Sequence, residues 1–334
     1  MRQAFDSSDQ SVRTDLALEA TEVLRGRGRR EIPGVEVHEE KQDDITVTRV
    51  NVTTDAGAEL MGKPKGRYIT IEAPSLRKRN RDLQQRVGEV LSREFGALLQ
   101  DGQFAGGQIP DSFLVVGLGN WRATADSLGP KVVSRLLVTR HLRDYVPVEL
   151  TGKLRAVAAV APGVLGITGI ETSEVVRGIV ERTSPQAVVA IDSLCARSVD
   201  RIITTIQIAD TGIHPGSGIG NKRVGLTRDV LGVPVIALGI PTVVHAMTIA
   251  DNTLEAVAAY LSSSPGLLGR LDGMSVEDRR RVVEKAVSER LGDLVVTPKE
   301  IDSYIGDMAR VVAGSLNVAF HPGIDVGDLS KYLF

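Results

Sequence analysis

Residues 112–120 read SFLVVGLGN, an apolar run that reaches its glycine turn without alternating with polar residues. Such a run is typical of a strand buried on both faces of a sheet. Three similar runs follow at 154–164 (LRAVAAVAPGV), 186–194 (QAVVAIDSL) and 233–244 (VPVIALGIPTVV), and helical patterns cover 129–146, 173–185 and 245–263. This alternation predicts an α/β fold, with a mostly parallel twisted sheet flanked by helices.

The segments on either side of this region have a different character. Residues 35–75 alternate with a period of two in VEVHEE, ITVTRVNV and YITIEAP, separated in part by a turn at 55–57, which predicts an N-terminal antiparallel β segment. Further helices are expected over 16–30, 77–99, 275–294 and 296–320, the last two forming C-terminal helices. Residues 1–15 are polar and without periodicity, so they are expected to form an extended arm.

Composition narrows the class of protein. The chain has 334 residues and a formal net charge of −2, so no overall field points to nucleic acid or to an anionic membrane. Cys195 is the single cysteine, which cannot form an internal disulfide and favours a reducing compartment. No apolar run approaches the length of a membrane span, and the start of the chain, MRQAFDSSDQSVRTD, lacks the apolar stretch of a secretory signal. We therefore expect a cytoplasmic protein with neither a nucleic-acid nor a membrane partner.

Two acidic residues follow strand-like runs, where sites form in open parallel sheets. Asp126 lies in GLGNWRATADSLGPKV (117–132), and Asp192, in AIDSLCAR (190–197), ends the expected strand. Asp126 also suits a helix cap, whereas a carboxylate at the end of VVAI has little structural role. We expect the two side chains to meet in one cleft, where close like charges raise one pKa and leave the other group ionised. One carboxylate can then activate water while the other donates a proton.

Several other sequence patterns suggest sites different from the Asp126 and Asp192 pair. Residues 117–119 (GLG) resemble a dinucleotide loop but lack its third glycine. Residues 210–212 (DTG) match a pepsin-like tripeptide in a chain of the wrong architecture, and Asp210 stays a third carboxylate candidate. His214 and His245 could complete a divalent-metal site with the two carboxylates, although no HExxH motif is present. Cys195 has no histidine near it in sequence, which favours packing over nucleophilic chemistry.

Six stretches together resemble the germination protease family of spore-forming bacteria: 13–20 (RTDLALEA), 115–132 (VVGLGNWRATADSLGPKV), 187–194 (AVVAIDSL), 210–223 (DTGIHPGSGIGNKR), 239–246 (GIPTVVHA) and 296–302 (VTPKEID). The resemblance implies an endopeptidase that starts the digestion of small acid-soluble spore proteins in the spore core during germination. It also implies a homotetrameric zymogen with a core similar to hydrogenase maturation proteases. The family's two essential aspartates fall on Asp126 and Asp192.

The family cuts after an acidic residue and before a large aliphatic residue, then alanine, with a glutamate further on. Residues 15–19 (DLALE) follow this pattern, so the resemblance predicts self-cleavage between Asp15 and Leu16. The chain would then divide into a propeptide (1–15), a β-rich segment (16–76), an α/β protease core (77–263) and a C-terminal helical extension (264–334). Acidic substrate groups could be received by Lys222, Arg223, His214 or the basic cluster at 25–30.

We expect a peptide hydrolase that needs no cofactor and no obligatory metal, and that has small acid-soluble spore proteins and further copies of itself as partners. Two alternatives stay open at this point. One is a divalent-metal-dependent peptidase that adds His214 or His245 to the two carboxylates. The other is a non-catalytic spore protein that binds acidic or nucleotide ligands through its glycine loop. The sequence does not assign which aspartate is the acid and which is the base.

Overall fold

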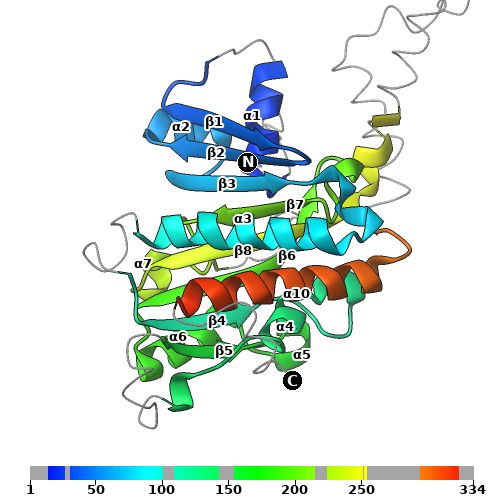
Figure 1. The fold of residues 1–334 in the computed structure, drawn as a ribbon. Coiled ribbons are helices and arrows are strands. Elements are labelled where there is room, and N and C mark those ends of the chain that lie inside the picture. Colours follow the sequence, from blue (N-terminus) through cyan, green and yellow to red (C-terminus); the bar gives the residue numbers. More distant parts are fainter. Residues whose placement is uncertain are drawn as a thin grey trace, which may run out of the picture.

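The computed structural model describes residues 14–26, 31–100, 109–142, 154–214, 224–250, 252–253 and 294–322. These residues form one nine-stranded sheet with the order β1-β2-β3-β7-β8-β6-β4-β5, and β9 pairs with the end of β8 (Figure 1). The strands are β1 (Val35–Gln42), β2 (Ile45–Val52), β3 (Gly66–Glu72), β4 (Ser112–Gly117), β5 (Ala156–Val160), β6 (Ala187–Ala196), β7 (Thr205–Ala209), β8 (Val235–His245) and β9 (Val295–Val296).

The predicted α/β fold is confirmed, and the sheet divides into two halves by strand direction. Strands β5, β4, β6 and β8 are parallel, and they are the four apolar runs found in the sequence. Strands β1, β2 and β3 pair antiparallel, as their alternating pattern predicts. The unpredicted strand β7 runs antiparallel to both β3 and β8 and so joins the two halves. The sheet as a whole is therefore mixed.

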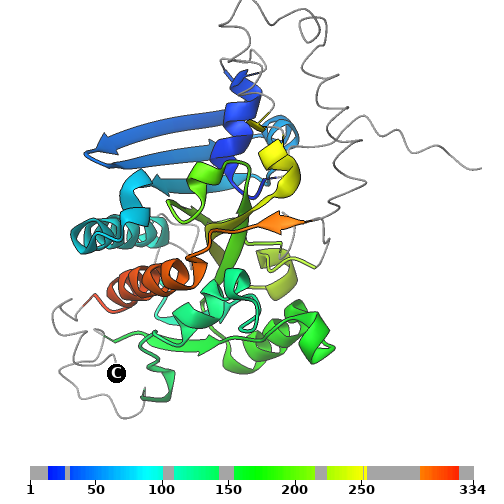
Figure 2. The same cartoon turned by 90° about the vertical axis from the view of Figure 1, so that its right-hand side faces the viewer.

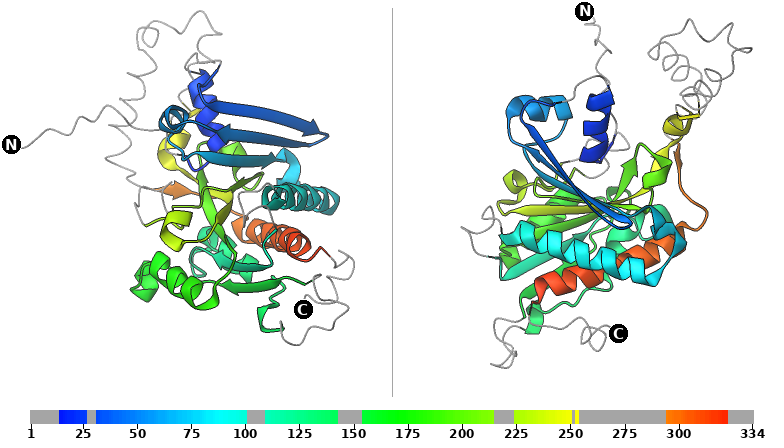
Figure 3. Two further views of the ribbon diagram at one scale, coloured as in Figure 1. Left: turned by 90° about the vertical axis from the view of Figure 1, so that its left-hand side faces the viewer. Right: turned by 45° about the horizontal axis from the view of Figure 1, so that its top comes forward.

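Helices cover both faces of the sheet. They are α1 (Ala17–Gly26), α2 (Asp55–Met61), α3 (Arg81–Gln100), α4 (Leu128–Val133), α5 (Leu165–Thr168), α6 (Thr172–Thr183), α7 (Arg228–Leu231) and α10 (Ile301–Phe320). Helices α3 and α10 lie side by side over one face (Figure 2), and α1 and α6 lie on the other side of the sheet (Figure 3). No described helix has the length and apolar character needed to cross a membrane.

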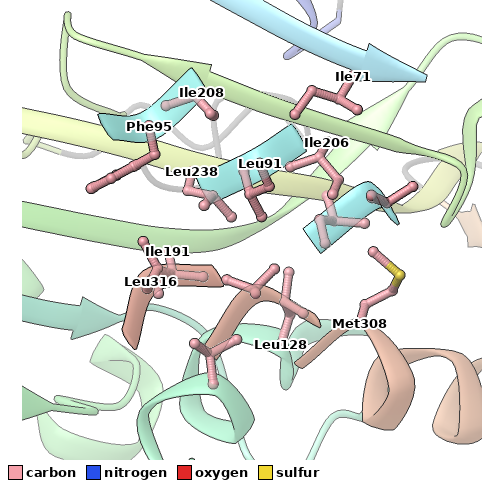
Figure 4. Close-up of a cluster of buried hydrophobic side chains, with 14 of the residues drawn as sticks. Ile71, Leu91, Phe95, Leu128, Ile191, Ile206, Ile208, Leu238, Met308 and Leu316 are labelled. Carbon is pink, nitrogen blue, oxygen red and sulfur yellow. The ribbon is translucent and has the colours of Figure 1, made fainter. Parts of the chain in front are cut away.

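The largest core fills the space between the sheet and helices α3 and α10 (Figure 4). Leu91 and Phe95 from α3 and Leu316 from α10 point toward Ile191 of β6 and Leu238 of β8. Full burial of each such side chain contributes about 1.5–3 kcal/mol, so this layer holds the parallel strands rigidly in place. The opposite faces of β4 and β6 pack against α6 and α7 in a second cluster.

The predicted helix over 129–146 is wrong in length, because α4 ends at Val133. Distant groups take over the backbone beyond it. Leu137 N–H donates to Asn317 Oδ1 at 2.9 Å, and Thr139 N–H donates to Val157 O, also at 2.9 Å. Backbone groups bonded in this way are not available to continue a helix.

The turn expected at 55–57 is the first turn of α2. Its N-cap is Thr54, whose Oγ1 accepts a hydrogen bond from Gly57 N at 3.1 Å, a preferred helix start. The C-terminal helix begins at Ile301, a few residues after the predicted cap at Thr297. The expected arm over 1–13, the helix over 275–293 and most of the helix over 245–263 lie outside the described residues.

The sheet and its core run across the predicted segment boundaries. Strand β3 of the 16–76 segment pairs with β7, and helix α10 of the 264–334 segment packs on α3 and α4. Leu16, the first residue after the predicted cleavage point, is fully buried in the main core cluster. The described residues on both sides of the α/β region therefore share its sheet and its core.

Candidate active site

Asp192 lies within β6 at the position that pairs with Gly239 of β8, and only 7% of it is exposed. Burial raises the pKa of Asp192 well above its usual value, and the charges of Asp126 and, more weakly, Asp15 raise it further. A hydrogen bond from Ser193 N–H to Asp192 Oδ1, at 2.8 Å, acts in the opposite direction. The balance favours a protonated carboxyl group at this point of the sheet.

Asp126 reaches the same region on the loop that follows β4. Asn120 N–H donates both to Asp126 Oδ2 (3.0 Å) and to Asp126 O (2.9 Å), which ties the loop back onto the glycine turn. Gly119 has a φ of +107°, and a Cβ there would lie 2.0 Å from Asp126 O. A Cβ on Gly129 would lie 2.6 Å from the carbonyl oxygen of Ile191, the residue before Asp192. The glycines of this loop thus allow it to press against β6, which accounts for the GLG turn without a nucleotide.

The structure brings Asp126 and Asp192 close enough for the charge of one to raise the pKa of the other. Asp126 is partly buried and belongs to a short 3-10 turn, Thr124–Asp126. The N-cap of α4 is Ser127, without a side-chain cap bond, so Asp126 is not the cap of that helix. The capping reading of Asp126 therefore fails, while the catalytic roles of both carboxylates stay a prediction.

The predicted cleavage segment lies at the end of the strand that carries Asp192. Asp15 N–H donates to Cys195 O at 3.3 Å, and Cys195 N–H donates to Asp15 Oδ2 at 2.9 Å. The amide of Leu16 donates to Thr14 Oγ1 at 3.0 Å, and helix α1 begins at Ala17. Residues 14–16 are thus held in a defined, non-helical conformation three residues along β6 from Asp192.

Two side chains donate to the carbonyl oxygen of Asp15. Lys63 Nζ lies 3.0 Å from this oxygen and 2.9 Å from Thr14 O, and Gln207 Nε2 lies 3.0 Å from Asp15 O. The same Gln207 side chain accepts a hydrogen bond at Oε1 from Ala17 N–H, at 2.7 Å. Burial lowers the pKa of Lys63, while the charges of Asp15 and Glu19 oppose that shift. The carbonyl group of the peptide bond between Asp15 and Leu16 is therefore held by two side-chain donors.

Glu19 is the acidic residue four positions beyond the predicted cleavage point, and it is 2% exposed. Arg197 N–H donates to both of its carboxylate oxygens, at 3.0 and 2.9 Å, and the Thr14 hydroxyl donates to one of them. Arg201 forms an ion pair with Glu19 at 3.3 Å and also bonds Glu22 and Glu72. A buried carboxylate with this many donors is a specific anchor for the segment.

The other residues singled out in the sequence have different surroundings. Asp210 is paired with Arg67, whose N–H and Nε donate to its two oxygens at 2.7 and 2.9 Å, so it ties β7 to β3. His214 is exposed and its ring lies against Gly225. Lys222, Arg223 and residues 27–30 of the basic cluster lie outside the described residues.

Cys195 is 2% exposed, and burial, together with the charge of Asp15, raises the pKa of its thiol to about 12 despite a hydrogen bond from His245 N–H. A thiol this basic is a poor nucleophile, in keeping with the packing role expected for it. Among the residues that the structure describes, no three His, Cys, Asp or Glu side chains gather in a way that could hold a metal ion.

Sequence reasoning missed Lys63, Gln207 and Arg201. One signal was available for Gln207, because it interrupts TIQIA, an otherwise apolar strand with every residue buried. Lys63 lies in the short GKPKG connection between α2 and β3, and nothing local separates it from a solvated lysine. Arg201 resembles any arginine of a polar loop until the fold brings Glu19, Glu22 and Glu72 around it.

Comparison with known proteins agrees with the resemblance seen in the sequence. The family model of the germination protease matches residues 13–264 and 261–333. A germination protease of Caldanaerobacter subterraneus subsp. tengcongensis is 46% identical over 326 residues, covering 96% of this chain and 98% of its own. Germination proteases of Bacillus cereus and Bacillus mycoides are 41% and 40% identical, each covering 99% of this chain and 100% of their own.

Among solved structures, the [NiFe] hydrogenase maturation protease HycI from Thermococcus kodakarensis KOD1 aligns with 66% of this chain and 98% of its own. Its TM-score is 0.32 and its identity 16%. The family model and the full-length relatives together cover nearly the whole chain. The chain therefore belongs to the germination protease family.

Proposed function

We propose that this chain is an endopeptidase of spore germination that uses Asp126 and Asp192 to hydrolyse peptide bonds, and that it cuts its own Asp15–Leu16 bond. One observation carries this proposal. The charges of Asp126 and Asp15 both act on the buried Asp192, so two acidic groups and the residue before the bond share one neighbourhood. Family membership supports the peptidase activity, and the DLALE pattern supports the position of the cut.

The raised pKa of Asp192 supports a division of roles between the carboxylates. Asp126, as the base, takes a proton from a water molecule whose oxygen adds to the carbonyl carbon of Asp15. The carbonyl electron pair moves onto the oxygen. When it returns, the C–N bond breaks and Asp192 gives its proton to the leaving nitrogen of Leu16. The proton on Asp126 then returns to the pair by way of solvent, which restores the starting state.

The seating of residues 15–19 supports a substrate class. Acidic proteins with an acidic residue, a large aliphatic, an alanine and a later glutamate would offer the same groups as this segment. We propose that the substrates are small acid-soluble spore proteins in the spore core, and that the enzyme is a homotetrameric zymogen activated by loss of residues 1–15. In the uncut chain Arg201 and the backbone N–H of Arg197 hold Glu19, and these groups would select a substrate glutamate once Glu19 has left them.

Mass spectrometry of the purified chain tests the proposal directly. The wild type incubated alone should lose residues 1–15 and begin at Leu16, while Asp126→Asn and Asp192→Asn should stay intact. Asp229→Asn is a matched control, because Asp229 is an exposed carboxylate in the first turn of α7. A wild-type product that begins elsewhere, or an active Asn variant at either site, would contradict the proposal.

Incubation with a chelator extends the test to the metal-dependent alternative. Activity that survives exhaustive chelation agrees with the two-carboxylate mechanism. Activity that is lost, and is then restored by one specific divalent ion, would favour the alternative.

A further inference from the structure

The carbonyl oxygen of Asp15 has surroundings that differ from an ordinary turn. It accepts hydrogen bonds from a lysine ammonium and from a side-chain amide, Lys63 Nζ and Gln207 Nε2, each at 3.0 Å. Both distances fall in the range of about 2.7–3.1 Å that is typical of donors in oxyanion-binding sites. Donors arranged in this way strengthen their bonds as negative charge develops on the oxygen, which is the condition for lowering a hydrolytic barrier.

The register of the sheet places one of these donors, Gln207, in the same row as the acid Asp192. Gln207 of β7 and Asp192 of β6 both pair with Gly239 of β8, so they stand in one row across three strands and face the same side. Two strand spacings separate their backbones by roughly 10 Å. Gly239 contributes no side chain to this row, and Leu194 packs over it. The row thus has a hydrogen-bond donor at one end, the acid at the other and an apolar floor between them.

Burial disfavours the charged form of Lys63, and a role in anchoring the segment does not account for a lysine in this position. Burial lowers its pKa, yet its Nζ donates to two main-chain carbonyl oxygens, those of Thr14 and Asp15. Glu19 already anchors the segment, through its buried ion pair and through hydrogen bonds from the Arg197 N–H and the Thr14 hydroxyl. A compact ammonium beside a carbonyl oxygen is most useful when that oxygen becomes negative.

We propose that Lys63 and Gln207 form the oxyanion-binding site for self-cleavage and stabilise the negative charge that develops on the Asp15 carbonyl oxygen. This inference rests on the proposed cut between Asp15 and Leu16. Lys63 supplies a full positive charge. Gln207 supplies a neutral donor through Nε2, and at the same time it fixes the leaving side of the bond by accepting Ala17 N–H.

The experiment compares self-cleavage rates of Lys63→Met and Gln207→Glu with the wild type by mass spectrometry. Methionine keeps the length of the lysine stem without the charge. Glutamate keeps an oxygen for Ala17 N–H but removes the donor to Asp15 O. Each variant should cut at the same bond about 10²–10³-fold more slowly, the usual effect of losing one oxyanion donor. Lys65→Met is the matched control, because Lys65 is an exposed neighbour that pairs only with the exposed Asp55 among the ion pairs of the described residues. It should cut at the wild-type rate.

A second measurement separates catalysis from seating. Amide hydrogen exchange of residues 14–20 is followed in the Asp126→Asn background, with and without Lys63→Met or Gln207→Glu. We expect the protection of this segment to persist in the double variants. Wild-type cleavage rates in both single variants, or slow cleavage accompanied by lost protection, would overturn the inference. An uncut wild type, or a cut Asp126→Asn chain, would instead refute the proposed function.

Discussion

Replacing Asp192 by asparagine should change how the stability of the fold depends on pH. The folded-state pKa of this carboxyl is raised, chiefly by burial and next by the charge of Asp126. Protons therefore bind the folded chain more tightly than the unfolded chain. The stabilising contribution is complete below the unfolded pKa of about 3.9, and it is lost as the pH rises through the folded pKa. Asparagine has no proton to lose, so a chain with asparagine at this position should lack that dependence.

The size of the effect follows from the linkage between pKa and stability. Each unit by which the folded pKa exceeds the unfolded one corresponds to about 1.4 kcal/mol of unfolding free energy. Across the window between the two pKa values, the carboxyl should cost the fold up to about 1.4 kcal/mol per pH unit relative to asparagine. At pH values above the window, the asparagine variant should be the more stable of the two.

The comparison is best made between Asp126→Asn and the double variant Asp126→Asn/Asp192→Asn, since neither should process itself during the measurement. Urea unfolding at a series of pH values from 4 to 8 gives the difference in unfolding free energy. Asp126→Asn removes the second cause of the shift, but burial, the first cause, still raises the pKa of Asp192 in that chain. A difference that stays constant over the whole series would show that the pKa of Asp192 is not raised, and the assignment of Asp192 as the acid would fall with it.

Three further outcomes follow from individual contacts. Gly119→Ala should destabilise the fold by about 1–3 kcal/mol and stop self-cleavage, because a Cβ would lie 2.0 Å from Asp126 O at a φ of +107°; urea unfolding and mass spectrometry read out the two effects. Asp210→Asn should weaken the fold by roughly 1.5–3 kcal/mol, because it loses charge-assisted bonds to Arg67. The variant should still process itself. A folded variant that stays uncut would make Asp210 a catalytic candidate again. The Cys195 thiol, with a pKa of about 12, should resist iodoacetamide in the folded chain at pH 8 and react once urea unfolds it.

The central strands, and the approach of Asp126 to Asp192, could be predicted from the sequence, while the catalytic roles of the two carboxylates stay a prediction. Apolar runs without alternation mark strands buried on both faces, and an acid such as Asp192 within a buried strand has few structural explanations. The register of β6 positions Asp192, and the glycine contacts bring the Asp126 loop against that strand. These features depend on neighbouring residues or on the general geometry of parallel sheets, so one sequence is enough to predict them.

Features that depend on distant partners were not predictable in this way. Helix α4 stops early because Asn317, 180 positions away, accepts the Leu137 N–H. The contact between Gln207 and Asp15 spans 192 positions, and it exists only because β7 inserts between β3 and β8. Helix α2 is a different case, since its Thr54 cap was visible in the sequence but lay within a segment dominated by strand alternation.

The complete burial of Leu16 has a consequence for the direction of the reaction. As long as the chain is continuous, the nitrogen of Leu16 belongs to a neutral amide that donates to Thr14 Oγ1. The proposed cut would turn this nitrogen into an ammonium group near Lys63 and would give Asp15 a second carboxylate beside Asp192. Burying these new charges costs on the order of several kcal/mol per ion, even though Lys63 can pair with the new carboxylate, so the new ends should separate and draw water between them. The departing peptide would carry away the carboxylate needed to re-form the bond, so the proposed processing would be a one-way step.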